Sequence, residues 1–234
     1  MGSKKGIDVS EFNGAIDWAA VKASGKVDFA ILRSGLGWTD GDVSLRRDKR
    51  FLENVRGCEA NGIPYGIYHY SYCLKPENEV REAEYVLRLI EGTRPAYGVW
   101  WDIEESKQIQ LGRAALTQMA QTFCETLSAA GWTVGIYSYL AWLEQYMDMD
   151  ELAGWPVWLA QVGVQAPTYK RPFVMWQYSW SGRVDGITGA VDLDETVGDW
   201  PPVSGQQSGL IAALESVEQM IIQMKEDYTN GKLR

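Results

Sequence analysis

The sequence predicts an α/β protein whose barrel begins with β/α units and finishes with β-strands alone. Short apolar runs alternate with helical patterns, and this order implies a parallel sheet. After about residue 155 the gaps between apolar runs become too short for full helices. The length of 234 residues, 46% of them hydrophobic, fits one large domain plus a small appendage. We therefore expect an irregular, TIM-like barrel.

Eight apolar runs are expected to form strands, at residues 6–9, 29–34, 65–72, 98–104, 133–139, 157–161, 174–179 and 190–194. Five helical patterns fill the first gaps, at residues 17–24, 47–61, 77–90, 112–130 and 140–147. The second helix has a defined end, because Asn61-Gly62 is followed by Pro64. Glycine can adopt the left-handed cap, and proline cannot continue the helix.

Charge and composition argue against several classes of protein. A formal net charge of −9 argues against nucleic acid and against an anionic membrane surface, since both need a positive field. Three cysteines without a Cys-x-x-Cys spacing signal neither a disulfide framework nor a zinc site, so free thiols are expected. His69 is the only histidine, which excludes a metal site with several histidines. No phosphate-binding loop or dinucleotide fingerprint is present, and no cofactor is expected.

The N-terminus enters the first predicted strand without an apolar region. No secretory signal is therefore expected, and synthesis in the cytoplasm is predicted. No stretch approaches the roughly 18 uninterrupted apolar residues of a membrane span, so no membrane partner is expected.

Two acids that flank one isoleucine, Asp102 and Glu104, are the most informative residues of the chain. Side chains alternate along a strand, so Trp100 shares a face with both acids, while Val99 and Ile103 point the other way. An apolar face opposite two carboxylates suits a strand between a helix layer and a polar pocket, which is the setting for acid/base chemistry. The spacing alone leaves open a solvated strand end with two acidic residues.

Polar and aromatic side chains gather near the ends of the predicted strands, where β/α barrels place their functional groups. The polar candidates are Asp8, Arg33, His69, Asp102, Glu104, Tyr137, Gln161, Gln177 and Asp192. Many of the 11 Trp and 12 Tyr fall in the same segments, although core packing accounts for about half of those rings. Acids among aromatic rings suit a carbohydrate, because a sugar presents hydroxyls to polar groups and an apolar C–H face to rings.

Five motifs occur in the order in which one known family carries them: Gly6-Ile-Asp-Val-Ser-Glu-Phe-Asn-Gly14, Gly66-Ile-Tyr-His-Tyr70, Asp102-Ile-Glu104, Trp176-Gln-Tyr-Ser179 and Val191-Asp-Leu-Asp194. Over about residues 6–200 the chain resembles glycoside hydrolase family 25, the lysozymes or N-acetylmuramidases, of the bacterial or phage endolysin type. The resemblance implies a barrel of five β/α units followed by three strands. It also implies cleavage of the β-1,4 bond between N-acetylmuramic acid and N-acetylglucosamine in peptidoglycan, and action on the bacterial cell wall.

The resemblance implies a role for each acid. Glu104 matches the general acid/base, which gives a proton to the leaving glycosidic oxygen and should have a raised pKa. Asp102 matches an anion that orients the substrate's own 2-acetamido group while its oxygen attacks the anomeric carbon. Asp8 and Asp192 match two further acids of the site, or could instead accept hydrogen bonds from loop backbone or from Arg33.

Six residues are candidates for contact with the substrate: Arg33, Tyr68, His69, Tyr137, Trp158 and Gln177. Two of them keep a second interpretation. Arg33 could brace an acid rather than bind a ligand. His69 could be a buried, hydrogen-bonded histidine rather than a hydrogen-bond donor at the rim of the barrel.

The chain departs from the family pattern at two places. Asp194 stands where the family usually carries Asn, and it could add negative charge behind Asp192 or face away. Gly35-Leu-Gly-Trp38 leads into a polar stretch, residues 39–48, in place of the commoner acidic turn. The fine specificity for substrate could differ accordingly.

Residues 1–200 are expected to form the catalytic barrel, and residues 201–209 a linker, because paired prolines and a Ser/Gly/Gln run resist regular structure. Residues 210–234 are expected to form an amphipathic helix, since their apolar residues recur at alternating spacings of four and three. This helix could fold back on its own barrel, pair protomers in a homo-oligomer, or connect to a wall-binding module.

Two rival functions remain. A chitinase-like hydrolase of N-acetylglucosamine polymers could use the same assisted mechanism, although its longer motif, Asp-x-x-Asp-x-Asp-x-Glu, is not met. A catalytically silent glycan-binding barrel predicts the loss of an acid, yet Asp8, Asp102, Glu104 and Asp192 are all present.

Overall fold

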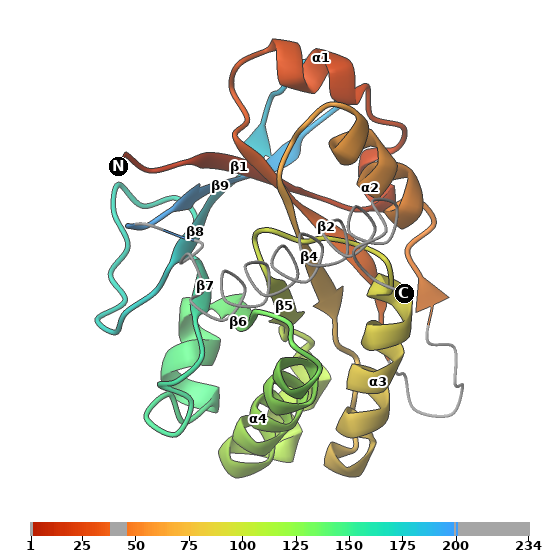
Figure 1. The fold of residues 1–234 in the computed structure, drawn as a ribbon. Coiled ribbons are helices and arrows are strands. Elements are labelled where there is room, and N and C mark those ends of the chain that lie inside the picture. Colours follow the sequence, from red (N-terminus) through yellow and green to blue (C-terminus); the bar gives the residue numbers. More distant parts are fainter. Residues whose placement is uncertain (1, 38–45, 199, 201–234) are drawn as a thin grey trace, which may run out of the picture. The chain divides into compact units, whose positions relative to one another are not determined.

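A closed β-barrel forms the centre of the computed structural model, which describes residues 2–37, 46–198 and 200 (Figure 1). Its strands are β1 (Lys5–Val9), β2 (Phe29–Leu36), β4 (Tyr65–Tyr70), β5 (Val99–Asp102), β6 (Val134–Tyr139), β7 (Val157–Ala160), β8 (Met175–Gly182) and β9 (Val191–Thr196). The barrel closes because β1 pairs with both β2 and β9. Neighbouring strands from β1 to β8 are parallel, whereas β9 is antiparallel to both of its neighbours. The expected α/β barrel of eight strands is confirmed.

Four α-helices follow the first four barrel strands: α1 (Trp18–Ala23), α2 (Phe51–Ala60), α3 (Glu79–Ile90) and α4 (Arg113–Ala129). Gly62, just after α2, has a φ of 60°, in agreement with the predicted cap. Where a fifth helix was expected, at residues 140–147, a short π-helical segment spans Trp142–Tyr146. The structure also contains η1 (Glu11–Asn13), η2 (Pro76–Asn78), η3 (Ser106–Leu111) and the two-residue strand β3 (Arg46–Arg47). These four elements are too short to produce a hydrophobic period, so the sequence did not reveal them.

Alternation along the strands sorts the large side chains into two apolar layers. Trp101 and Ile103 pack outward, in the layer between the strands and the helices. Trp100 packs inward with Tyr137 and Trp158, and the rings of Trp100 and Trp158 meet edge to face with centroids 5.9 Å apart. Aromatic rings thus fill the barrel interior, as side chains fill other closed barrels of this size.

The outer layer beneath α3 contains two buried acids, Glu79 and Glu82. Burial raises the pKa of Glu79 well above its ordinary value, and the charge of Glu82 raises it further. The nearby polar groups of Trp101 and Cys73 lower it in part. Glu79 therefore keeps its proton at pH values where an exposed glutamate is ionised.

Replacing Glu79 by glutamine is expected to weaken the pH dependence of stability. A carboxyl with a raised pKa binds more protons in the folded state than in the unfolded chain, so the free energy of unfolding falls as pH rises toward that pKa. Denaturant titrations of parent and variant between about pH 7.5 and 9 measure this effect, since a histidine is largely neutral there in both states. The variant should lose less stability over this range than the parent. An equal loss would show that Glu79 is already ionised in the folded protein.

Residues 1–200 form one compact unit. Its three cysteines, Cys58, Cys73 and Cys124, are buried and free, as expected. Within the described ranges no helix has the length and hydropathy of a membrane span. The predicted linker and C-terminal helix, and residues 39–45 of the polar stretch, lie outside the described residues.

Candidate active site

An open pocket of about 350 Å³ lies at the edge where the parallel strands end. Asp8 reaches it from β1, Asp102 from the end of β5, and Asp192 from β9. Because β9 is antiparallel, its first residues lie at this same edge, and Asp192 is the register partner of Asp8. The other lining residues are Ser10, Phe12, Asn13, Arg33, Tyr68, Tyr70, Glu104, Tyr137, Trp158, Gln177 and Ala190. All four predicted acids therefore share one pocket, called here the acidic pocket.

Asp102 and Glu104 both face the acidic pocket, although β5 ends at Asp102, two residues earlier than expected. The backbone N–H of Ile103 donates to the carbonyl of Tyr137 at 3.2 Å, so pairing continues past the end of the strand. Ile103 packs in the outer layer, and alternation then returns Glu104 to the pocket side.

Glu104 has the raised pKa that a proton donor needs at neutral pH. Burial is the main cause, and the charges of Asp192 and Glu105 add to it. Hydrogen bonds from the hydroxyls of Tyr139 and Tyr70 lower the pKa in part. Burial also raises the pKa of Asp192, to about 6. The raised pKa that was expected for Glu104 therefore agrees with its surroundings, and its role as proton donor stays a prediction.

Asp102 differs from the readily ionised anion that was expected. Burial raises its pKa well above the ordinary value, the charges of Glu104 and Asp8 raise it further, and Arg33 opposes them. The Oδ1 atom of Asp102 is buried and accepts no hydrogen bond from the part of the chain that the structure describes. A donor to this oxygen is needed to stabilise the anion, because a buried charge without partners is costly.

Asp194 lies against Asp8, and its pKa is raised well above the ordinary value. It is fully buried, and the indole N–H of Trp158 donates to its Oδ1 at 2.9 Å. Burial raises the pKa of both carboxyls, and a hydrogen bond between them shifts the two pKa values in opposite directions. That bond lowers the pKa of Asp8 and raises that of Asp194, while Gln177 Nε2 also donates to Asp8 at 2.8 Å. Asp194 thus neither adds charge behind Asp192 nor faces away.

Asp194→Asn is expected to be tolerated, because an amide can donate to Asp8 and accept from Trp158 as a protonated carboxyl does. Asp194→Leu has a similar size but leaves the indole N–H of Trp158 without its acceptor, at about 1–3 kcal/mol, while Asp8 keeps the donor from Gln177. Denaturant unfolding and hydrolysis of cell walls by the two variants would be compared. If the asparagine variant is damaged as severely as the leucine variant, the site needs an ionised residue 194.

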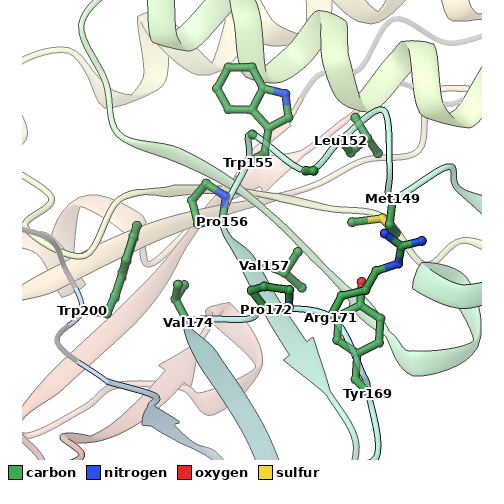
Figure 2. A pocket seen from close by; sticks show the side chains of 12 residues that line it. Met149, Leu152, Trp155, Pro156, Val157, Tyr169, Arg171, Pro172, Val174 and Trp200 are labelled. Atoms are coloured by element: carbon green, nitrogen blue, oxygen red, sulfur yellow. The ribbon is translucent and has the colours of Figure 1, made fainter.

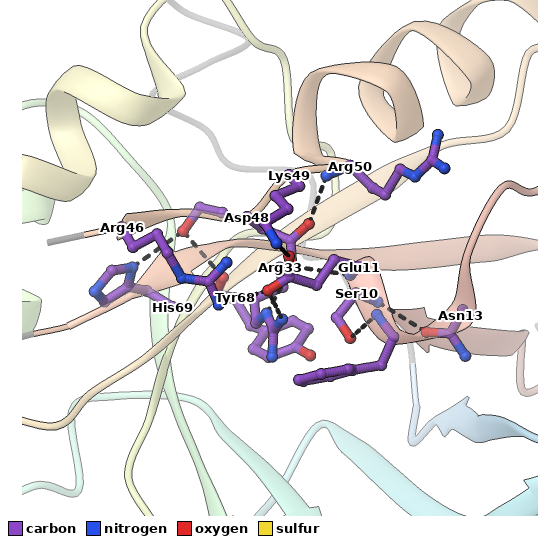
Figure 3. A network of polar contacts seen from close by, with 12 residues as sticks. Ser10, Glu11, Asn13, Arg33, Arg46, Asp48, Lys49, Arg50, Tyr68 and His69 are labelled. Carbon is purple, nitrogen blue, oxygen red and sulfur yellow. Dashed lines mark hydrogen bonds and ion pairs between the residues drawn. The ribbon is translucent and has the colours of Figure 1, made fainter. Parts of the chain in front are cut away.

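Arg33 lines the acidic pocket, but its guanidinium donates hydrogen bonds to two acids, Asp48 and Glu11, that do not line the pocket (Figure 3). Its Nε donates to Asp48 Oδ2 at 2.8 Å, and its Nη2 donates to Glu11 Oε1 at 3.2 Å. Arg33 and Asp48 are both buried. The geometry favours the interpretation of Arg33 as a brace over direct contact with a substrate.

His69 does not line the acidic pocket. It follows Tyr68 on β4, so its side chain takes the opposite face, where it is fully buried. Its Nδ1 lies 3.2 Å from Ser34 Oγ, and its Nε2 lies 3.5 Å from Glu82 Oε1. Burial, followed by the charge of Arg33, lowers the pKa of His69 to about 3, so the ring is neutral. The structure supports the buried-histidine interpretation and not contact with a substrate.

Four other substrate candidates do line the acidic pocket: Tyr68, Tyr137, Trp158 and Gln177. The Tyr137 hydroxyl donates to Gln177 Oε1 at 2.9 Å, which orients the amide toward Asp8. Gln161, the remaining candidate at a strand end, instead hydrogen-bonds Thr168.

Three aromatic residues of the site were not among the predicted site residues. Tyr70 lines the acidic pocket two residues after Tyr68, and period two along β4 could have identified it. Tyr139 bonds Glu104, two residues after Tyr137 on β6, and the same rule applies to it. Phe12 sits in η1, a turn without a periodic pattern, and only its place within the first motif pointed to it.

A second pocket, of about 340 Å³, lies at the opposite edge of the barrel (Figure 2). It adjoins the start of β7 at Val157, the residue before β8, Val174, and Trp200. Among the described residues that line it, Arg171 alone is charged, so it lacks paired carboxyls. The described ranges also contain no group of three or more His, Cys, Asp or Glu that could hold a metal ion. The acidic pocket is therefore the candidate active site.

A closed α/β barrel with paired carboxyls among aromatic rings at its strand ends is typical of a glycoside hydrolase. The profile of glycosyl hydrolases family 25 matches residues 7–187. The chain belongs to this family.

Several relatives resemble the chain. The autolytic lysozyme of Clostridium acetobutylicum is 31% identical over 194 residues, which cover 82% of this chain and 55% of the relative. Lysozyme M1 of Streptomyces globisporus is 31% identical over 207 residues, covering 82% of this chain and 67% of the relative.

Two solved structures share the fold. The modular autolysin LytC of Streptococcus pneumoniae, in complex with a synthetic peptidoglycan ligand, has a TM-score of 0.74 and 27% identity, covering 83% of this chain and 47% of that one. A bacterial lysozyme of Streptomyces coelicolor has a TM-score of 0.71 and 26% identity, covering 86% and 94%. The chain thus spans about half the length of the clostridial lysozyme and of LytC.

Proposed function

We propose that the protein is a muramidase that cleaves the β-1,4 bond between N-acetylmuramic acid and N-acetylglucosamine in bacterial peptidoglycan. The observation that carries this proposal is the convergence of Asp8, Asp102, Glu104 and Asp192 in one aromatic-lined pocket of a family 25 chain. Two relatives are lysozymes by name, and LytC was solved with a synthetic peptidoglycan ligand, which supports the same substrate. The bacterial wall is accordingly its proposed place of action.

In the proposed reaction, Glu104 gives its proton to the glycosidic oxygen while the bond to the leaving sugar breaks. Tyr70 and Tyr139 hold its carboxyl in position. The acetamido oxygen of the substrate attacks the anomeric carbon, and the acetamido N–H donates to the unpartnered Oδ1 of Asp102. This hydrogen bond supplies the donor that Asp102 lacks, so its anion is stabilised as positive charge develops on the sugar. The ionised Glu104 then activates the water that opens the intermediate.

Digestion of purified peptidoglycan, with identification of the new reducing end, tests the proposal. Muramic acid at that end would support it, and glucosamine would indicate a glucosaminidase. Free peptide amines would rule out glycosidase activity as the main function. Chitin oligomers form the second arm, in which preferred cleavage would indicate a chitinase-like hydrolase, and binding without cleavage a silent glycan-binding barrel.

Two finer features of the architecture belong to the proposal. We treat Trp142–Tyr146 as the fifth helix of a barrel with five β/α units, since this segment follows β6 and packs Trp142 and Leu143 into the outer layer. We propose that residues 201–209 link the barrel to an amphipathic helix, residues 210–234, that pairs protomers or connects to a wall-binding module. Solution mass before and after deletion of residues 205–234 tests the pairing, and an unchanged monomer would end it.

A further inference from the structure

Another hollow, of about 560 Å³ and distinct from the pocket beside β7, adjoins the acidic pocket, and Phe12 lines both. The other residues around this hollow are Glu11, Arg46, Lys49 and Arg50. We name Phe12, Arg46 and Lys49 the cationic shelf. Phe12 is 82% exposed, and the guanidinium of buried Arg33 lies 4.9 Å from its ring centroid.

The acids near the cationic shelf are buried, whereas its cations are exposed. The side chain of Glu11 is 10% exposed, while those of Arg46 and Lys49 are 39% and 78% exposed. Arg46 Nη2 donates to Glu11 Oε1 at 2.5 Å, and Lys49 Nζ lies 3.8 Å from Oε2 (Figure 3). Glu11 thus pairs with both cations, and the two cations line the hollow.

Among the residues that the structure describes, the balance of charge at the cationic shelf is positive. Arg33, Arg46 and Lys49 face two acids, Glu11 and Asp48, and Arg33 already bridges both. Arg50 does not enter this balance, because it pairs with Glu53. A surplus cation beside the active site is unusual in a chain whose formal net charge is −9. An anionic group is therefore the ligand that this surface suits.

We propose that the cationic shelf binds a carboxylate of the peptide attached to N-acetylmuramic acid, while the sugar occupies the acidic pocket. The inference rests on the proposed function. The sugars of the strand are uncharged, so the carboxylates of the attached peptide are the anions nearest to the bond that is cleaved. Arginine binds a carboxylate through parallel N–H donors, and lysine adds a mobile charge. Phe12, between the two hollows, offers an apolar surface to the linker from sugar to peptide.

Binding of two soluble glycan strands to the full chain tests this inference: one strand keeps its peptides, and an amidase has removed them from the other. The Glu104→Gln background keeps both strands intact. Lys49→Gln and the double variant Arg46→Gln/Lys49→Gln are compared with Lys26→Gln/Arg171→Gln. This control removes the same two charges from exposed ion pairs, Lys26 with Asp185 and Arg171 with Asp150, outside the shelf and the acidic pocket.

The dissociation constant for peptide-bearing strands should rise about tenfold in the double variant, and less in Lys49→Gln. Binding of stripped strands should not change, and added salt should weaken the preference of the parent chain for peptides. Equal losses for both strands, or none, would overturn the inference. Lys49→Gln keeps the test valid if the double variant unfolds, since this side chain is 78% exposed. Failure of the proposed function would instead appear as no muramic acid ends released by the chain with Glu104 intact, and the binding ratio would still be measurable.

Discussion

Glu104→Gln is expected to lower the turnover of peptidoglycan by about 10²–10⁴-fold, because the amide has no proton to give the leaving oxygen. The fold should survive. Glutamine has nearly the same shape, and its carbonyl oxygen can accept the hydrogen bonds from Tyr70 and Tyr139. The release of reducing ends measures turnover, and denaturant unfolding measures the stability of the same preparation.

Glu105→Gln is the matched control for this variant. It makes the same chemical change one residue along the chain, outside the acidic pocket. Glu105 accepts from the backbone N–H of Lys107 at the start of η3, so a small change in stability is expected. Loss of its charge should also lower the pKa of Glu104 slightly, while turnover stays close to that of the parent. Full activity in Glu104→Gln would refute its assignment as the proton donor.

The pH profile provides a second test of Glu104. A proton donor acts only while protonated, so turnover should fall as pH rises through the raised pKa of Glu104. Tyr139→Phe removes a hydrogen bond that lowers this pKa, and the falling limb should therefore move to higher pH. If the falling limb of the pH profile stays in place while Tyr139→Phe retains turnover, a group other than Glu104 controls that limb.

Arg33→Met is expected to destabilise the fold by about 3–5 kcal/mol, because breaking a buried ion pair leaves a buried charge without its partner. Methionine replaces much of the apolar stem of Arg33 but gives no donor to Asp48 or Glu11. Asp48 keeps the backbone N–H groups of Glu11 and Arg50, which compensate for only part of the loss. Denaturant unfolding at neutral pH measures the difference.

Arg50→Met is the control for the loss of charge and side-chain length. Arg50 pairs with Glu53 at the surface, where such pairs contribute about 0–1 kcal/mol. Arg33→Lys should fall between the two variants, since an ammonium keeps the charge but cannot reproduce the planar fork of donors. If Arg33→Met costs no more than Arg50→Met, the buried acids do not depend on Arg33.

The sequence by itself determined the barrel strands, the four α-helices and the shared face of Asp102 and Glu104. Each of these depends on a local rule: alternate residues of a strand take one face, and a helix repeats every 3.6 residues. Parallel strands also end at one edge, and this is why Asp8 could be expected beside the other acids. The roles of these acids in catalysis remain proposals.

Only the tertiary structure decided which polar groups meet. Asp48 and Glu11 bind the guanidinium of Arg33, and the ring of His69 lies against Ser34 and Glu82. The raised pKa of Asp194 follows from its burial and from its contact with Asp8 across the β1–β9 closure of the barrel. Such pairings join residues that are distant in the chain, and burial then shifts the pKa values of the groups that meet. Neither these pairings nor the burial of the groups produces a periodic pattern in the sequence, so neither could be predicted from the sequence alone.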